Sequence, residues 1–212
     1  MKSLLTLLFL ACTWNVFAQT TEKLDADKDY VITIKTAYGD MIVLLSDNAP
    51  LHKANFVKRA KTGYYDSTTF HRVIDGFMIQ GGDSLSKDKN PLNDGMGSNG
   101  TPIPAELATG LGHKKGAIAA ARIGDQANPQ RASNGSQFYI VLEDDGAKHL
   151  NGQYSVFGQV TDGFDVMRKI ANEQTDNRNR PLENVYMTMK VDVMKRSKII
   201  KKYKAKSFYE AK

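Results

Sequence analysis

An alternation of apolar and polar side chains near the end of the chain most constrains how this sequence can fold. Between Val185 and Met194 the odd-numbered positions are all Val or Met, and the positions between them are Tyr, Thr, Lys, Asp and Met. Successive side chains of a β-strand point to opposite faces, so this period of two predicts a strand with one buried face and one face toward water. The fold must therefore contain a sheet that is covered on one side.

Shorter β-rich segments recur along most of the chain. They cover residues 30–37, 41–46, 69–74, 77–80, 117–122 and 137–142. Tyr38-Gly39-Asp40 and Asp75-Gly76 separate pairs of these segments and are typical of hairpin turns. Helical spacing of apolar residues occurs in Pro50–Lys61 and Gly163–Glu173. The pattern predicts a single mainly-β domain of antiparallel strands with two helices, and closing its sheet into a barrel would remove the exposed edges.

The first eighteen residues have the pattern of a secretory signal peptide. Lys2 supplies a positive n-region, residues 4–11 are largely apolar, and Val16-Phe17-Ala18 gives a cleavage context before Gln19. The stretch is too short for a membrane anchor. A buried N-terminal helix is one alternative, and lipidation at Cys12 is another.

A signal peptide of this kind would direct the protein out of the cytoplasm and would be cleaved from the mature chain. Residues 1–18 would be removed, residues 19–29 form a polar, flexible lead-in, and the protein would be periplasmic or secreted. Cys12 is the only cysteine, so the mature chain would hold no thiol and no disulfide unless Cys12 stays as a lipid anchor. Nucleic acid is not an expected partner, because an exported chain rarely meets it.

The net charge of +6 is concentrated at the C-terminus. Residues 195–212 carry eight Lys or Arg and one Glu, a net +7, and Lys2 adds +1, which leaves −2 for residues 3–194. A block of like charge at a chain end is typical of a solvated, mobile terminus. The functional alternative is an arm that makes weak electrostatic contact with anionic lipid, polysaccharide or acidic clients.

Two motifs carry the chemistry of the chain. Residues 70–83 read FHRVIDGFMIQGGD, and residues 134–141 read NGSQFYIV, followed by His149-Leu150-Asn151-Gly152 and Val156-Phe157-Gly158. These motifs supply Arg, Gln and apolar rings without a nucleophile, which indicates a site that binds and polarises its substrate non-covalently. His71, Asp75 and Asp83 do not suggest a metal site, because neighbouring strand residues point to opposite faces. No metal or cofactor is expected.

These motifs resemble the cyclophilin family of peptidyl-prolyl isomerases, over roughly residues 30–194. The resemblance implies a closed eight-stranded antiparallel β-barrel capped by two α-helices, and catalysed rotation about X–Pro bonds of proline-containing clients. It implies a catalytic role for Arg72, which Gln80 would position. The residues implied to bind substrate are Phe77, Met78, Ala121, Arg122, Gln137, Tyr139, His149 and Leu150.

Four positions depart from the residues that are common in that family. Tyr139 replaces Phe, and its hydroxyl is expected to reach water at the pocket rim. His149 replaces the Trp of cyclosporin-sensitive members, which predicts weak cyclosporin binding. Arg122 replaces Asn and is expected to affect client preference, because the substrate binds the backbone near Ala121-Arg122. Tyr154 replaces a His, which is a mild change.

Two functional alternatives to an isomerase stay open. One is a proline-peptide binding module or holdase that uses the same groove without turnover, and the other is a structural barrel that acts through its basic tail. The presence of Arg72, Phe77, Gln80 and Gln137 favours the enzyme, since a simple binder could lose the arginine. The protein is expected to be a monomer.

Overall fold

The computed structural model describes residues 24–97 and 100–211, so the predicted signal peptide and Cys12 lie outside the described residues. The strands are β1 (Lys28–Thr36), β2 (Gly39–Leu45), β3 (Thr68–Thr69), β4 (Arg72–Ile74), β5 (Met78–Gly81), β6 (Ala117–Ala120), β7 (Phe138–Val141), β8 (Val156–Asp162) and β9 (Tyr186–Lys195). The helices are α1 (Pro50–Lys61), α2 (Phe164–Ala171), α3 (Arg196–Tyr203) and α4 (Lys206–Glu210), with 3-10 turns η1 (Ser84–Lys87) and η2 (Lys148–Leu150).

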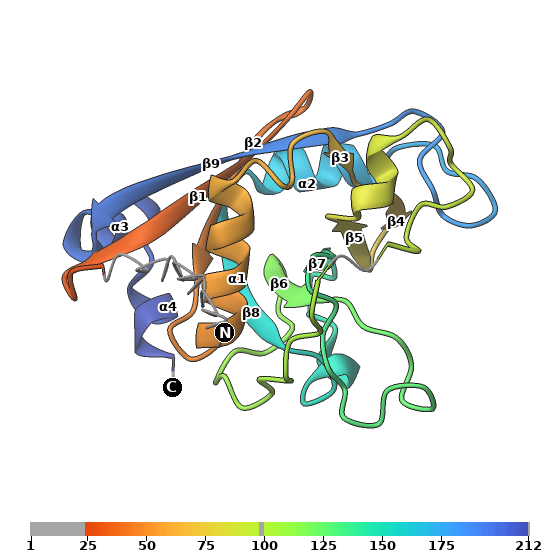
Figure 1. Ribbon diagram of the computed structural model, residues 1–212. Helices are drawn as coiled ribbons and strands as arrows, with labels where there is room; N and C mark the ends of the chain where they lie inside the picture. The colour runs from red at the N-terminus through yellow and green to blue at the C-terminus, as the bar shows by residue number, and fades with distance from the viewer. Residues whose placement is uncertain (1–23, 98–99, 212) are drawn as a thin grey trace, which may run out of the picture.

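All of these strands form one antiparallel sheet in the order β3-β9-β1-β2-β8-β6-β7-β5-β4. The two end strands, β3 and β4, are separated in the chain by only Phe70 and His71. The sheet therefore curls until one interrupted strand, the predicted segment 69–74, pairs with β9 on one side and β5 on the other (Figure 1). The predicted mainly-β fold is confirmed, and counting β3 and β4 as one strand gives the eight strands expected.

Apolar side chains from the inner face of the sheet fill the barrel. Ile32, Ile34, Met41, Val43, Ile79, Ile118 and Ile140 are all fully buried there. Helix α1 adds Phe56, whose ring lies 5.4 Å from that of Phe138 and 5.3 Å from that of Phe157. Helix α2 buries Val166, Met167 and Ile170. Both predicted helices are thus confirmed, and each is held by its apolar face.

The alternation predicted for the last strand holds over most of β9. Met187 is buried, and Met189 and Val191 are half-buried, whereas the residues between them up to Lys190 are exposed. The pattern then fails, because Val193 is 46% exposed. Met194 instead packs against the C-terminal helices, so the buried face of the strand changes side near its end.

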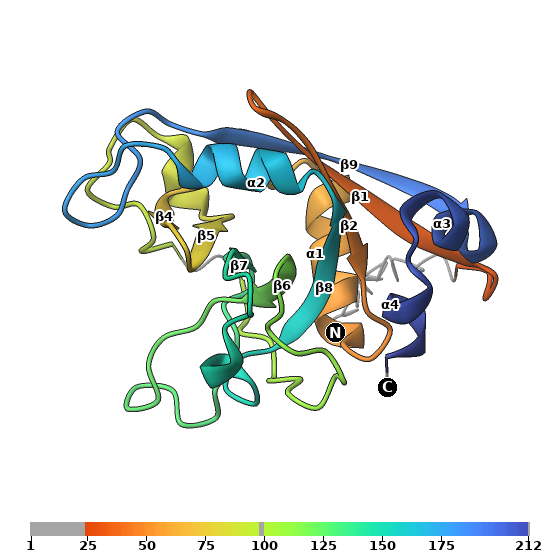
Figure 2. The same ribbon diagram turned by 180° about the vertical axis from the view of Figure 1, so that it is seen from behind.

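The C-terminal segment differs from the solvated terminus that its charge predicts. Helices α3 and α4 bury Ile199, Ala205 and Phe208 against Val31 of β1 and Leu44 of β2. These apolar residues lie between the lysines and cover the outer face of the β1–β2 hairpin. Figure 2 shows both helices at the end of the molecule opposite β4 and β5.

An ionic cluster fastens this segment to the barrel. The Lys53 Nζ lies 2.6 Å from Asp29 Oδ1 and 2.7 Å from Asp47 Oδ1. Arg196, at the start of α3, lies 2.6 Å from Asp47 Oδ2 and 3.5 Å from Asp29 Oδ2. Asp29, predicted as the last residue of a flexible lead-in, is therefore buried and belongs to β1.

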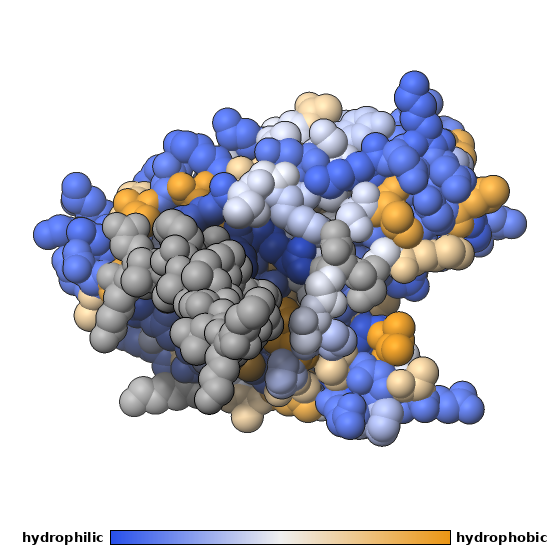
Figure 3. All heavy atoms as spheres, viewed as in Figure 1, coloured by the Kyte–Doolittle hydropathy of each residue, from blue (hydrophilic) through white to orange (hydrophobic). Residues whose placement is uncertain are grey.

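The face of the molecule in Figure 3 is mostly polar. Hydrophilic residues predominate on the face seen in Figure 3, and apolar residues form small separate patches. Within the described part of the chain, no helix is long and apolar enough to cross a membrane.

Candidate active site

Three of the predicted site residues lie in one row across neighbouring strands. Arg72 of β4 is opposite Gln80 of β5, and Gln80 is opposite Tyr139 of β7. Opposite residues of antiparallel strands share a face of the sheet, so these side chains lie on the same side. Ile79 and Ile140 alternate with them and are buried inside the barrel. The site is therefore on the outer face of the barrel.

A chain of side-chain amides holds Arg72 in place. The Arg72 Nη1 donates to Gln80 Oε1 at 3.3 Å, and the Gln80 Nε2 donates to Gln137 Oε1 at 3.0 Å. The Gln137 Nε2 in turn donates to the backbone oxygens of Gly95 and Gly97, at 3.0 and 2.6 Å. Because each amide nitrogen has an acceptor, each amide oxygen faces toward Arg72. Gln137 is buried, so it acts by positioning Gln80 and contributes little surface to the site.

The loop that receives Gln137 is itself anchored by a buried carboxylate. Asp83 accepts from the backbone nitrogens of Leu85, Gly95 and Gly97, at 3.0, 2.6 and 3.2 Å. A Cβ on Gly97 would lie 1.8 Å from Asp83 Oδ1, so only glycine allows this close approach. The double-glycine motif and the downstream loop therefore support the site through Asp83.

A hollow of about 240 Å³ lies beside Arg72. It is lined by Arg72, Phe77, Met78, Gln80, Ala121, Arg122, Tyr139, Leu150 and Tyr154. We call it the ring pocket, because aromatic and aliphatic side chains form most of its wall. Its size and the aromatic and aliphatic part of its wall suit a proline ring, and the wall also includes two arginines, Arg72 and Arg122.

A longer groove of about 550 Å³ adjoins the ring pocket and shares Gln80, Ala121 and Arg122 with it. Both backbone groups of Ala121 are already used, because its N–H donates to Gln137 O and its C=O accepts from Asn134 N. The backbone groups of Arg122 have no hydrogen-bond partner among the described residues. An extended peptide in the groove would therefore pair with Arg122.

Comparison with known proteins agrees with this geometry. Residues 31–191 match the family model for cyclophilin type peptidyl-prolyl cis-trans isomerases. The chain belongs to the cyclophilin family.

Individual relatives extend this result. A Dictyostelium discoideum peptidyl-prolyl cis-trans isomerase, cypE, is 35% identical over 161 residues, which cover 74% of this chain and 94% of cypE. A Streptococcus pyogenes protein, named as both a phosphatase and a peptidyl-prolyl cis-trans isomerase, is 36% identical over 73% of this chain. The chain spans only 37% of that protein's length.

A solved structure shows the same fold. The crystal structure of a Cryptosporidium parvum cyclophilin type isomerase in the presence of the dipeptide Ala-Pro superposes with a TM-score of 0.65 at 29% identity. The match covers 77% of this chain and 97% of the other.

Tyr139 corrects one expectation for this cyclophilin. Its hydroxyl does not reach water at the pocket rim, because the residue is 5% exposed and its Oη lies 2.9 Å from His113 Nε2. The His113 Nδ1 lies 2.9 Å from Asn151 Oδ1, which can only accept. His113 must therefore carry its proton on Nδ1 and accept the Tyr139 hydroxyl proton at Nε2. Burial lowers the pKa of His113 and raises that of Tyr139, so both are neutral.

His149 is placed differently from the expectation. It is exposed and stacks on the outer side of Phe77, with ring centroids 5.9 Å apart, but it does not line the ring pocket. Its neighbour Leu150 does line the pocket. His149 thus supports the pocket wall from outside.

Arg122 has a fixed side chain. Its Nε donates to Gln153 O at 3.0 Å, it pairs with Asp125, and its guanidinium carbon lies 4.5 Å from the centroid of the Tyr154 ring. Tyr154 in turn packs edge-on against Tyr139. Arg122 therefore stiffens the wall between the ring pocket and the groove.

Sequence reasoning missed His113 and Arg178 and treated Tyr154 only as a mild change. Nothing in the sequence around His113 marks it, although Asn151 lies within a quoted motif. Arg178 and Arg72 line the same hollow, together with His71, Arg180 and Gln80. Over the described ranges, no group of three or more His, Cys, Asp or Glu is placed to hold a metal ion.

Proposed function

We propose that this cyclophilin is a peptidyl-prolyl cis-trans isomerase that accelerates rotation about X–Pro bonds in folding client polypeptides. The observation that supports this is Arg72, which the Gln80–Gln137 chain holds at the edge of an apolar pocket. A fixed cation beside a pocket that fits a proline ring is the arrangement that amide rotation needs.

Amide resonance sets a barrier of about 18–20 kcal/mol for this rotation, so uncatalysed exchange takes roughly 10–100 s. Twisting the bond breaks the conjugation and leaves a lone pair on the prolyl nitrogen. A donor aimed at that nitrogen stabilises the twisted state more than either planar state, and only such a difference raises the rate. Arg72 suits this role, because a guanidinium stays charged and cannot act as a base. The mechanism is non-covalent.

The other site residues divide into three roles. Gln80 positions Arg72 and can contact the substrate backbone, and Gln137 positions Gln80. The ring pocket of Phe77, Met78, Tyr139 and Leu150 would hold the proline ring. Ala121 and Arg122 would line the peptide's path, and His149 would support Phe77.

The test is cis-to-trans exchange of a short Ala-Pro peptide, followed by NMR. Losing one preorganised donor costs about a hundredfold to a thousandfold in rate, so Arg72→Ala should slow exchange by that factor. Arg168→Ala is the matched control, because Arg168 is exposed on α2 and does not line the ring pocket, and it should keep the wild-type rate within about twofold. If wild type binds the peptide but leaves exchange at the uncatalysed rate, the chain is a proline-peptide binding module.

We further propose that the protein is exported, as a soluble or lipid-anchored form, and works as a monomer. The signal-peptide pattern of residues 1–18 supports export. Intact-mass analysis of the exported protein distinguishes the forms: a mass beginning at Gln19 supports the soluble one, and a mass with acyl chains on Cys12 supports the anchored one.

Cyclosporin binding should be weak. The exposed imidazole of His149 lacks the indole N–H and the large face of a tryptophan. Titration of wild type and His149→Trp with cyclosporin checks this, and equal affinities would contradict it.

A further inference from the structure

Three hollows meet at Gln80, and arginines predominate among the charged residues that line them. The ring pocket, the groove and the hollow beside Arg178 all contain Gln80. Their described lining residues include four arginines, and Asp94 is the one carboxylate among them. The arginines are Arg72, Arg122, Arg178 and Arg180.

The hollow beside Arg178, which we call the arginine hollow, has a volume of about 250 Å³ and is lined by Arg72, Gln80, Asp94, Arg178 and Arg180, together with His71, Pro91, Gly95 and Met96. Arg72 and Gln80 also line the ring pocket, so the two hollows share a wall. A peptide with its proline in the ring pocket can therefore place a neighbouring side chain in the arginine hollow, since an extended chain advances about 3.3 Å per residue.

The carboxylate in the arginine hollow is paired within the protein. Asp94 is nearly buried and lies 2.6 Å from the Nε of Arg180. Arg180 also donates to Asn184 Oδ1 and to Pro181 O, at 2.6 and 2.8 Å. This pair is therefore internally satisfied and leaves little charge for a ligand.

Besides Arg72, Arg178 is the cation that is left to face the hollow. Its side chain is 47% exposed, and its Nη2 donates to Pro91 O at 3.2 Å. The nearest carboxylate, Asp176, lies 3.6 Å away and accepts from the backbone nitrogens of Arg178 and Arg180. Asp176 thus serves the turn, and its charge only partly compensates Arg178.

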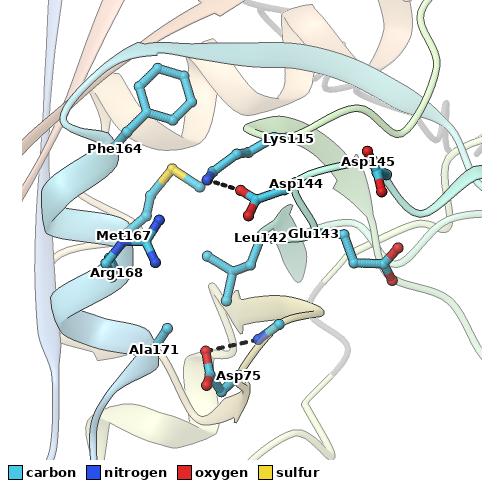
Figure 4. A pocket seen from close by; sticks show the side chains of 11 residues that line it. Asp75, Lys115, Leu142, Glu143, Asp144, Asp145, Phe164, Met167, Arg168 and Ala171 are labelled. Atoms are coloured by element: carbon cyan, nitrogen blue, oxygen red, sulfur yellow. Dashed lines mark hydrogen bonds and ion pairs between the residues drawn. The ribbon is translucent and has the colours of Figure 1, made fainter.

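The turn end of the β4–β5 hairpin, away from the Arg72–Gln80 pair, has the reverse charge. A further hollow there is lined by Asp75, Glu143, Asp144 and Asp145, with Lys115 and Arg168. In Figure 4, Lys115 pairs with Asp144, whereas Glu143 and Asp145 project away from it. The charge difference between the two ends of the hairpin therefore draws a negative side chain of a bound peptide toward the arginine hollow and away from the acidic one.

We propose that the arginine hollow is a subsite for a carboxylate side chain of the client, one to three residues from the isomerised proline, and that Arg178 selects it. This rests on the proposed isomerase function of the ring pocket. Arg72 and Arg178 both line the hollow, so a carboxylate there would meet two guanidinium groups. A lysine in the same place would be repelled by both.

The test compares peptides that differ at one position. Each has a central Ala-Pro and carries Glu, Gln or Lys at one of the three positions on either side of it. At low ionic strength, at least one position should give a kcat/KM about fivefold to tenfold higher for Glu than for Lys, through KM. At 0.5 M NaCl this ratio should fall toward one, because the hollow is open to solvent.

Variants of Arg178 decide which residue is responsible. Arg178→Ala should reduce the Glu-to-Lys ratio to below about twofold, and Arg178→Glu should invert it. Lys198→Ala, which removes an exposed cation on α3 that lines none of these hollows, should keep it. The Gln peptide is the reference within each variant. A wild-type ratio near one at all positions, or a ratio that Arg178→Glu leaves unchanged, overturns the subsite.

Failure of the isomerase proposal would look different. In that case no peptide, including the Gln peptide, would exchange faster than in buffer. Calorimetric titration of the same peptides would then test the subsite alone, with the same Glu-to-Lys comparison read as affinity.

Discussion

At the scale of single residues, the ring pocket depends on polar groups behind it. Tyr139 forms part of the apolar wall, yet its hydroxyl bonds to His113, which Asn151 orients in turn. A buried polar group is tolerated when it has a partner and is costly when it loses one. Tyr139 and His113 therefore depend on each other, and replacing either one alone is expected to lower the stability of the protein.

We therefore expect Tyr139→Phe to lower the free energy of unfolding by about 1–3 kcal/mol, because His113 Nε2 would remain buried without its donor. The ring that faces the pocket is retained, so kcat/KM should fall by less than about threefold. Urea unfolding and peptide exchange measure the two effects. Replacing Tyr154, which packs edge-on against Tyr139 without a hydrogen bond between them, by Phe is the control. A fully stable Tyr139→Phe would contradict the role of His113.

At the scale of elements, the C-terminal helices form part of the fold. Ile199 of α3 is fully buried against the outer face of β1 and β2, and Arg196 at the start of α3 joins the ionic cluster around Asp29. A solvated tail would make neither contact. The lysines of this segment are exposed because the apolar residues between them face the sheet.

Ile199→Ala should consequently destabilise the protein by about 2–5 kcal/mol, as expected for truncating a buried side chain. Lys198→Ala, one residue earlier on the exposed side of the same helix, should change stability by less than about 0.5 kcal/mol. Both are measured by urea unfolding. Equal stability of the two variants would show that α3 is not docked in solution.

At the scale of the whole molecule, the basic C-terminal segment and the candidate active site lie at opposite ends. Helix α3 lies far from β4 and β5, and the segment 195–212 carries a net +7 (Figures 1 and 2). Contact of this basic end with an anionic surface would leave the ring pocket open. We propose such a contact as weak and electrostatic.

Vesicles that contain anionic lipid should bind the protein at low salt and release it at 0.5 M NaCl, because the lysines are exposed. Replacing Lys198, Lys201 and Lys202 by Gln should abolish sedimentation with the vesicles, whereas Arg178→Ala at the other end should not. Peptide exchange should continue on bound protein. If sedimentation with the vesicles were unchanged by both salt and the lysine substitutions, the contact would not be electrostatic.

Local patterns in the sequence located many of the strands and helices and placed Arg72 and Gln80 on neighbouring strands. Period-two and helical patterns located β1, β2, β9, α1 and α2, because such patterns report which face is buried. The motifs around Arg72 and Gln80 were sufficient to place the two residues on paired strands. Local sequence carries this information, since neighbours in a hairpin are set by the turn between them.

Which distant residues meet depends on the folded structure. His113 and Tyr139 are 26 residues apart, and Arg178 and Pro91 are 87 apart, so no local pattern pairs them. The same limit explains the C-terminal segment: its charge predicts a solvated tail, but the uncovered apolar face of β1 and β2 gives Ile199 and Phe208 a place to pack. Burial depends on what the rest of the chain leaves exposed, and that is a property of the folded molecule.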